Sequence, residues 1–438
     1  MADKKEKPVI IKLPPFEDTH FPHEPEFLFA KHTSRIFYGN AENFAKLSKL
    51  EANRRHGYTV MVEGTDLWFP LAIIRGSQPG PTIVITAGIH AAEYPGIKAA
   101  LELSYDLDFS TITGTVIIVA MANAAGFWRR SNSMIPGPYT STGIDQNLNR
   151  IFPGNAQGSP DERLAAALFA LIETADYYID LHSGDSYESL IPHAYFCAMP
   201  AGGVLGDGTL GDAALGDGNP SDATLGDRTP SDNALGNKPL GDKAAPTSRD
   251  GVDAADATST ADAADTTATI NTSSSEHQQV CTQSQKMAHC VKVPYLVPFF
   301  GYHGGTAYSE ACKAGIPGIL IERGGMGLCE RVDVDNFKAD VMNLLRKLGC
   351  MHGVFDTYED AQEILATQHF DTAHVTGVWS PRCKSGDSVY PNQVLGTITD
   401  PFGNTLETIL AKGEGVILYQ TESLNIIAGE LAVAYAEE

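Results

Sequence analysis

Apolar positions in the first half of the chain fall into short runs separated by glycine and proline, which is typical of β-strands. From Tyr58 onward this pattern predicts three strands, at residues 59–64, 67–76 and 82–88. The third run is nearly all β-branched or apolar, as in a strand that is covered on both faces of a sheet. The segment 91–103, which follows it, consists of good helix formers and predicts a helix.

The alternation of strands and helices continues along the chain. The pattern predicts strands at 116–123, 175–184 and 315–325, and a helix at 161–174. Strands that alternate with helices indicate an α/β core, with a mixed, mostly parallel sheet flanked by helices.

Residues 201–275 differ in composition from the rest of the chain. Leu-Gly, usually followed by Asp, recurs there at multiples of five residues, and aromatic residues are absent. The segment contains 12 Asp, no Glu and 4 Lys plus Arg, which gives a net charge of 4 − 12 = −8. Such a segment buries too little apolar surface to offset its ordering entropy, so we expect a disordered insertion. A repeat solenoid and a calcium-binding role remain alternatives.

The other segments complete the predicted domain organisation. Residues 1–30 are rich in proline and charge and predict an N-terminal arm. The insertion divides a catalytic domain into residues 31–200 and 276–365. Residues 366–438 contain short β segments separated by glycine turns, which predict a small all-β C-terminal domain.

The charge of the chain limits its partners. The sequence has 438 residues, a net charge of −23 and a pI near 4.9. A nucleic-acid-binding protein needs a basic face, so this class is excluded. A small anionic substrate is still compatible, because a metal ion and one or two arginines can reverse the local field.

The cysteines and the apolar runs indicate a compartment. Seven cysteines are scattered along the chain without a Cys-x-x-Cys pair, which favours free thiols in a reducing environment. The N-terminal residues lack an apolar run of signal-peptide length, and no stretch approaches the length of a membrane span. We therefore expect a soluble, cytoplasmic protein.

Two of the predicted strands are followed by residues that can bind a metal. His90 and Glu93 lie just after the strand at 82–88 and, being three residues apart, can face the same way. His182 ends the strand at 175–184, with Asp180 two residues earlier on the same side. Imidazole nitrogen and carboxylate oxygen are normal zinc donors, and catalytic zinc usually takes three protein ligands. Alternatively, the first pair lies on a helix surface, and His182 is a core histidine.

Three further motifs carry candidate catalytic groups. Asn149 and Arg150 lie in a loop bounded by Pro and Gly, and suit the recognition of a carboxylate. The Arg129-Arg130 pair offers another cation, which could polarise a carbonyl. Glu322 ends an apolar strand, where it could act as a general base beside a metal-bound water. The alternatives are a surface arginine in a turn and a Glu322–Arg323 charge pair.

Taken in order, these motifs resemble the succinylglutamate desuccinylase/aspartoacylase family of zinc carboxypeptidase-like hydrolases. The motifs are HxxE after a strand, an NR-FPG loop, DLHSG at a strand end, and IPxxxIExGG. The resemblance extends from about Tyr58 to Cys350, apart from the insertion, and includes the C-terminal β segments. It implies a zinc carboxypeptidase-like fold.

The resemblance also implies roles for the candidate residues. His90, Glu93 and His182 would bind one Zn²⁺ per chain, and Glu322 would be the catalytic base. In the same way, the family pattern implies that Asn149 and Arg150 hold a substrate carboxylate and that Arg130 is the electrophilic arginine, in preference to Arg129.

The chain departs from the family pattern at two places. Asn147 stands where the family often has Asp, so the charge that supports a zinc-binding histidine is missing or comes from Asp145 or Asp180. Ser131-Asn132 stands where relatives often have Thr-Arg, which makes the identity of the electrophilic arginine ambiguous.

The predicted function is zinc-dependent hydrolysis of an amide bond in a small carboxylated substrate, specifically deacylation of an N-acyl amino acid. A metallocarboxypeptidase that acts on peptide C-termini is the nearest alternative, and a non-catalytic binding protein is a more distant one. The C-terminal β segments also resemble a lipoyl- or biotinyl-like barrel, but Lys412 lacks the context of an attachment site. We expect no nucleic-acid or membrane partner, and a homo-oligomer is compatible with the sequence.

Overall fold

The computed structural model describes residues 10–11, 27–28, 35–131, 135–140, 146–199, 274–300 and 305–438. They all fall in one compact unit, Met1–Ala223 with Thr272–Glu438, whereas a second unit, Thr224–Asn271, lies outside the described residues. The predicted insertion is therefore almost entirely outside them. So is most of the predicted N-terminal arm, in which β1 (Ile10–Ile11) pairs antiparallel with β2 (Phe27–Leu28).

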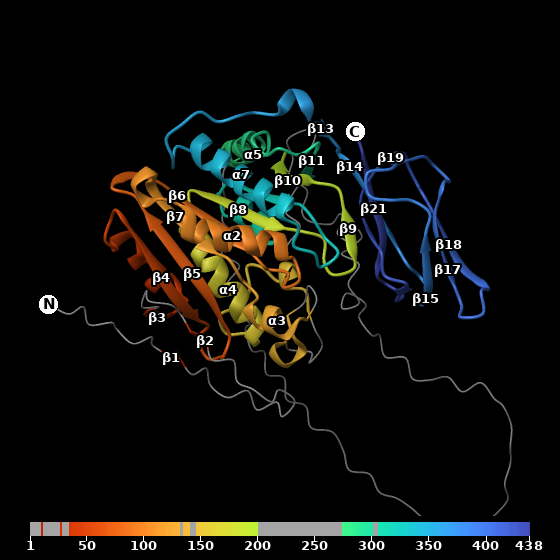
Figure 1. Ribbon diagram of the computed structural model, residues 1–438, viewed down its shortest axis with the longest axis horizontal. Helices are drawn as coiled ribbons and strands as arrows, with labels where there is room; N and C mark the ends of the chain where they lie inside the picture. Colours follow the sequence, from red (N-terminus) through yellow and green to blue (C-terminus); the bar gives the residue numbers. More distant parts are fainter. Residues whose placement is uncertain are drawn as a thin grey trace, which may run out of the picture. The chain divides into compact units, whose positions relative to one another are not determined.

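Ten of the described strands form the central sheet (Figure 1). In sheet order they are β13 (Glu363–Ile364), β11 (Tyr295–Phe300), β10 (His193–Ala198), β12 (Gly318–Glu322), β8 (Tyr177–His182), β6 (Gln78–Ala87), β7 (Thr113–Val119), β5 (Trp68–Arg75), β4 (Arg54–Met61) and β3 (Arg35–Tyr38). Six of the nine strand pairings are parallel, including the central run β7-β6-β8-β12. The predicted mixed, mostly parallel sheet is confirmed.

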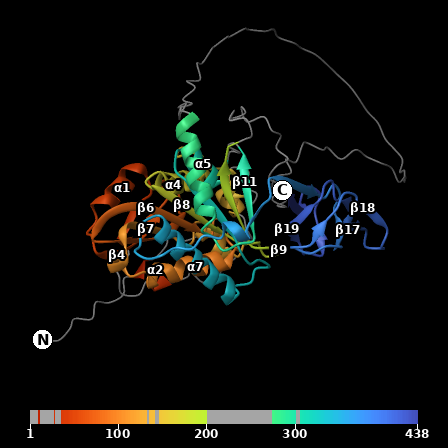
Figure 2. The ribbon, with the colours of Figure 1, turned by 90° about the horizontal axis from the view of Figure 1, so that it is seen from above.

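Helices cover both faces of this sheet, as Figure 2 shows. The α-helices are α1 (Ala41–Ala45), α2 (Tyr94–Asp106), α3 (Ala124–Arg129), α4 (Pro160–Ile172), α5 (Ser274–Ala288), α6 (Ala307–Lys313) and α7 (Arg331–Lys347). Short 3₁₀ turns are η1 (Lys46–Lys49), η2 (Phe109–Thr111), η3 (Gly137–Tyr139), η4 (Leu148–Arg150) and η6 (Glu359–Ala361). Helices α2 and α7 pack into the apolar core on one face, and α4 and α6 pack into the core on the other.

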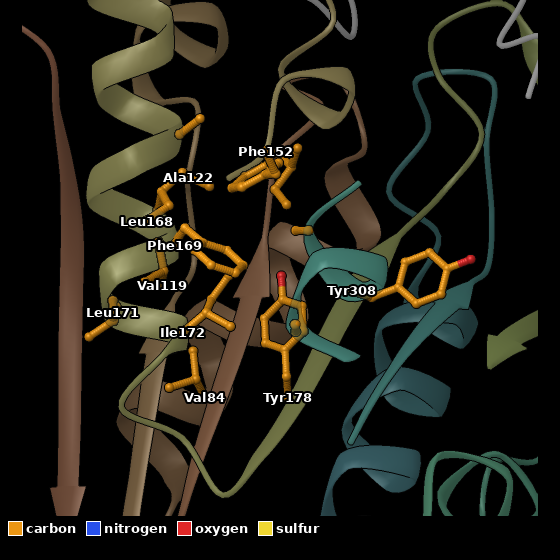
Figure 3. Close-up of a cluster of buried hydrophobic side chains, with 14 of the residues drawn as sticks. Val84, Val119, Ala122, Phe152, Leu168, Phe169, Leu171, Ile172, Tyr178 and Tyr308 are labelled. Carbon is orange, nitrogen blue, oxygen red and sulfur yellow. The ribbon is translucent and has the colours of Figure 1, made fainter. Parts of the chain in front are cut away.

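The core beneath α4 is drawn in Figure 3, where Leu168 and Ile172 of the helix lie over Val84 and Val119 of the sheet. Helix α4 begins in the expected way for its sequence. Ser159 and Glu162 form a capping box, and Pro160 occupies the first turn, where its missing N–H costs nothing. This helix fixes the face of the sheet on which the site residues lie.

Side-chain alternation assigns the polar residues of the central strands to that same face. In β8, Tyr178 belongs to the core under α4, so Asp180 and His182 point the same way. In β12, Leu320 belongs to the same core, so Glu322 does too. The parallel register pairs His182 with Glu322, which places both side chains next to each other at the carboxyl edge of the sheet.

The C-terminal β region, residues 367–438, contains two small antiparallel sheets. Its strands are β14 (Thr367–Thr372), β15 (Gly377–Pro381), β16 (Ser388–Val389), β17 (Val394–Thr399), β18 (Thr405–Leu410), β19 (Gly415–Thr421), β20 (Asn425–Ile426) and β21 (Leu431–Glu437). The presence of all-β sheets here agrees with the sequence pattern. Strand β9 (Glu188–Leu190), which follows β8, pairs antiparallel with β19 and joins this region to the main core.

One glycine in this region is required by packing. A Cβ atom on Gly396 would lie 2.1 Å from the ring of Trp379, which is fully buried between the two small sheets.

Among the described helices, none is both long and apolar enough to cross a membrane.

Candidate active site

His90 and Glu93 lie in the tight connection between β6 and α2. The strand ends at Ala87, and Gly88 turns the chain with a φ of +69°, a conformation that L side chains rarely adopt. Glu93 is the N-cap residue of α2. The predicted helix therefore begins three residues later than expected, and the turn that replaces its start directs both side chains to the edge of the sheet.

His90, Glu93 and His182 converge. His90 Nδ1 lies 2.6 Å from Glu93 Oε1, and His182 Nδ1 lies 3.0 Å from Glu93 Oε2. The two Nδ1 atoms are 3.3 Å apart, and one donor atom from each residue lies within 4.8 Å of the others. The residues are only 9%, 3% and 1% exposed. Two imidazole nitrogens and a carboxylate in this arrangement are able to hold a divalent metal ion.

The groups beside the two histidines determine which ring nitrogen carries the proton and which has a free lone pair. Asn147 Oδ1 accepts a hydrogen bond from the backbone N–H of Asn149, which identifies it as the oxygen of the amide. His90 Nε2 lies 3.0 Å from that oxygen and must therefore be the protonated nitrogen. Its Nδ1 is left with a lone pair that points at the cluster.

His182 is oriented by a carboxylate. Asp180 Oδ2 lies 3.0 Å from His182 Nε2, and its charge favours the proton on that nitrogen. Asp180 Oδ1 accepts a hydrogen bond from Thr86 Oγ1, which in turn accepts one from the hydroxyl of Tyr178. Charge support at this site thus comes from Asp180 beside His182, whereas His90 is supported by the neutral amide of Asn147. Asp145, the other expected source, lies outside the described residues.

The electrostatics of the cluster suit a cation. Burial raises the pKa of Glu93, but the adjacent His90 and His182 imidazoles outweigh it and lower this pKa to about 2. Burial lowers the pKa of His182, but the carboxylates of Asp180 and Glu93 raise it well above its ordinary value. Without a metal, a proton on His182 balances these charges, and a divalent cation would displace that proton.

Glu322 lies beside this cluster, half-buried at the end of β12, and lines the same pocket. The next residue, Arg323, points to the opposite face of the sheet and pairs with Asp340 of α7 at 2.5 Å. The structure therefore does not contain a Glu322–Arg323 charge pair, which was the alternative interpretation of this motif.

Asn149 and Arg150 form the turn η4 and also line the pocket. Asn149 Oδ1 accepts a hydrogen bond from the backbone N–H of Ala307, the first residue of α6. Because the oxygen is engaged in this way, the NH₂ group of the amide is the part that can donate to a ligand.

Arg130 is the predicted site residue that the structure does not bring to this pocket. It is exposed, with a φ of 54°, at the C-cap of α3. Arg129 lies with its guanidinium 5.2 Å from the ring centre of Tyr139. Among the described residues that line the pocket, the arginine is Arg150. Asn132, which follows in the ambiguous motif, lies outside the described residues.

The pocket also contains residues that the sequence did not indicate. The lining residues not mentioned so far are Ser183, Asp185, Glu188, Leu190, Tyr195, Thr306, Tyr308 and Tyr419. Tyr419 comes from β19 of the C-terminal β region and is brought to the pocket by its register with Leu190 of β9. No local sequence pattern reveals a contact between positions so far apart.

His193 is a further buried histidine and lies beside Glu322. It begins β10, directly opposite Glu322 in the antiparallel register. Its Nδ1–H donates to the carbonyl of Ile191 at 2.7 Å, and the ring of Tyr419 stacks against it with a centre-to-centre distance of 6.2 Å. Burial lowers the pKa of His193 to about 4, so the ring is neutral near pH 7.

Comparisons with known proteins show a likeness to one enzyme family over part of the chain. Residues 79–200 match the family model of the succinylglutamate desuccinylase/aspartoacylase catalytic domain. Over 149 residues, 32% of this chain, the sequence is 34% identical to an N-alpha-acetyl-L-2,4-diaminobutyric acid deacetylase from Halomonas elongata. The chain matches only 41% of the length of that relative.

Solved structures share the fold over most of the chain. The product-bound ectoine utilization protein EutE (DoeB) from Ruegeria pomeroyi superimposes with a TM-score of 0.60 and 19% identity, covering 87% of this chain and 94% of that one. A succinylglutamate desuccinylase/aspartoacylase from Rhodobacter sphaeroides gives a TM-score of 0.61 and 16% identity, covering 89% and 98%. At these identities the likeness concerns the fold alone.

The matched family and relative are, by their names, enzymes that remove acyl groups. The family match over residues 79–200 and the similarity to the Halomonas relative confirm the resemblance to the succinylglutamate desuccinylase/aspartoacylase family drawn from the sequence motifs.

We expect Asp180→Asn to weaken metal binding by about 10–100-fold, because the neutral amide no longer raises the basicity of His182. The measurement is the zinc dissociation constant, obtained by competition with a chromophoric chelator. Asp335→Asn, at an exposed position on α7, serves as the control and should bind zinc like the wild type. Equal affinities for Asp180→Asn and the wild type would contradict the role given to Asp180.

The buried neutral His193 should make stability depend on pH. Its folded pKa lies below the unfolded value near 6.5, so the unfolded chain takes up the proton first and stability is lost as pH falls from about 6.5 to 4. The loss is on the order of 3 kcal/mol over that window. In urea titrations, His193→Asn should flatten this slope, while His352→Asn, at an exposed position, should leave it unchanged. Identical slopes for wild type and His193→Asn would contradict the assignment.

Proposed function

We propose that this protein is a zinc-dependent amidohydrolase that removes the acyl group from an N-acyl amino acid. One observation carries the proposal: His90 Nδ1, His182 Nδ1 and the Glu93 carboxylate converge in a pocket that also contains Glu322 and Arg150. A metal site, a base and a carboxylate-binding group within one pocket are the parts that this reaction requires.

The donor set fits Zn²⁺. The oxygen beside Nε2 of each histidine keeps a proton on that nitrogen, so Nδ1 is the atom that each would offer to a metal. Glu93 is held as a carboxylate by the backbone N–H of Ser183 as well as by the imidazoles. When bound here, zinc would polarise the scissile carbonyl and lower the pKa of a water molecule. We also assign the core to the zinc carboxypeptidase-like fold, with one such catalytic site per chain.

Glu322 is the general base in this proposal. It removes a proton from the attacking water and then delivers that proton to the nitrogen of the leaving amine. Its position is fixed by the pairing of β12 with β8, which holds it opposite His182. It stands on a strand at the rim of the pocket rather than on a loop, so the base is preorganised.

Asn149 and Arg150 hold the free carboxylate of the substrate. The guanidinium can donate two parallel hydrogen bonds to a carboxylate, and the Asn149 NH₂ group adds a further donor. This recognition selects an amino acid with a free α-carboxylate. The electrophilic role of Arg130 stays a prediction, and its exposed position at the end of α3 gives that role no support.

Two acidic residues suggest the character of the substrate side chain. Asp185 and Glu188 line the pocket near its junction with the C-terminal β region. Carboxylates in a partly enclosed pocket favour an ammonium group. The relative from Halomonas elongata acts, by its name, on an acetylated diamino acid, which has a second amine. We therefore propose an N-acyl amino acid with a cationic side chain as the preferred substrate.

Tyr419 favours a small substrate over a peptide. Through the pairing of β9 with β19, the C-terminal β region contributes this ring to the pocket wall and narrows it. A metallocarboxypeptidase, which must admit a polypeptide chain, would need this side of the pocket to be open.

A substrate screen tests the proposal. Zinc-loaded protein should release a primary amine from N-acetyl-2,4-diaminobutyrate and from N-acetyl-lysine, more slowly from N-acetyl-aspartate and N-succinyl-glutamate, and negligibly from dipeptides. Faster amine release from the anionic substrates than from the cationic ones would contradict the roles of Asp185 and Glu188. Faster cleavage of dipeptides would favour the carboxypeptidase.

Replacing Glu322 by Gln should lower turnover by a factor on the order of 10² or more while zinc stays bound, because the amide cannot take up the proton. Turnover and metal content are measured on the same preparation, with the exposed Glu363→Gln as the matched control. If Glu322→Gln retained wild-type turnover, Glu322 would not be the base.

A further inference from the structure

Three elements of the fold bring four metal-binding side chains together away from the catalytic pocket. Cys197 lies on β10, His277 and Cys281 lie on α5, and Cys312 lies on α6. All four are between 1% and 5% exposed. None of them lines the pocket that contains His90 and Glu322.

Three donor atoms of this cysteine cluster, those of Cys197, His277 and Cys281, are close enough to share one ion. Cys197 Sγ is 3.1 Å from Cys281 Sγ, and Cys281 Sγ is 3.4 Å from His277 Nε2. One donor from each of these three residues lies within 4.8 Å of the others. Cys312 contacts Cys197 in the same buried apolar cluster, next to these three donors, and is a candidate for a fourth ligand. The sulfur atoms are well beyond the ~2.05 Å length of a disulfide.

The surroundings hold the donors in place. His277 and Cys281 are four residues apart on α5 and therefore share one face of the helix. Ser284, further along that helix, accepts a hydrogen bond from the backbone N–H of Cys197 and donates one to the carbonyl of Gly318. These two bonds fix α5 against β10 and β12, so the cluster does not depend on a mobile loop.

The composition of the cluster selects the metal. Thiolate and imidazole donors favour Zn²⁺, and a set of three Cys and one His with four protein ligands is typical of a structural zinc site. Apolar side chains, Val280 and Met199, pack around the cluster. His277 and Cys312 also line a second pocket beside α5. Four protein ligands would nevertheless leave the ion no position for substrate.

We propose that Cys197, His277, Cys281 and Cys312 bind a second, structural Zn²⁺ ion. Cys197 and Cys281 are 84 positions apart, and the segment 200–273 lies between the two ends that the ion would join. Because a metal that binds only the folded chain stabilises it, the ion would offset the entropy of closing this long connection. The inference is independent of the proposed function, since it uses none of the catalytic residues.

Metal content tests the proposal directly. Wild-type protein that has been equilibrated with zinc, and then passed over a chelating resin, should contain two zinc ions per chain by mass spectrometry of the metal. Cys197→Ser and Cys281→Ser should each lower the content to one. Cys329→Ser removes an exposed cysteine and should keep two. A wild-type content of one that Cys281→Ser does not lower would overturn the proposal.

Cobalt spectroscopy tests the same proposal on a variant that retains the cysteines, and therefore does not depend on whether the serine variants fold. The double variant His90→Ala/His182→Ala removes the catalytic ligands, so cobalt should bind only at the cysteine cluster and give a thiolate-to-cobalt charge-transfer band in the near ultraviolet. Absence of that band would overturn the proposal. So would an intact mass that is lower by two hydrogens, with Cys197 and Cys281 protected from alkylation until a reductant is added, because that result identifies a disulfide.

Discussion

The carboxylate of Glu93, held between two imidazoles, is the interaction on which the rest of the site depends. Each of its oxygens faces one Nδ1 atom, and the group is almost fully buried. A charge buried to this extent is stable only if a countercharge lies within the same cluster. A protonated imidazole can supply it, but a divalent cation supplies it better and uses both ring nitrogens at once. The geometry of the turn after β6 therefore suits a site that can hold a divalent cation.

Strand register places Glu322 beside this arrangement. The parallel pairing of β8 with β12 sets Glu322 beside His182, and alternation along β8 places Asp180 behind the same imidazole. Thr86 and Tyr178 extend the chain of hydrogen bonds into the core under α4, so the orientation of His182 is determined by packed strands. Function here is a consequence of which residues end neighbouring strands and which face they occupy.

The sequence could predict those features that depend on local pattern. The strand ends at His182 and Glu322, the turn with His90 and the Asn149–Arg150 loop could all be located from apolar runs and the residues that follow them. Contacts between distant segments could not be predicted from such patterns. Tyr419 reaches the pocket through strand pairing between β9 and β19, and Cys197 meets Cys281 although the two are 84 positions apart. The position of Arg130 in the motif predicts the electrophilic arginine, whereas in the structure this residue is the αL C-cap of α3 and is exposed.

The central claim is that His90, Glu93 and His182 hold a metal ion through both Nδ1 atoms and one carboxylate. A crystal structure of zinc-loaded protein, with anomalous diffraction recorded on both sides of the zinc edge, measures this directly. The account predicts an anomalous peak about 2.0–2.2 Å from His90 Nδ1, His182 Nδ1 and a Glu93 oxygen. No peak at this position, or a peak bound through Nε2 of either histidine, would contradict it.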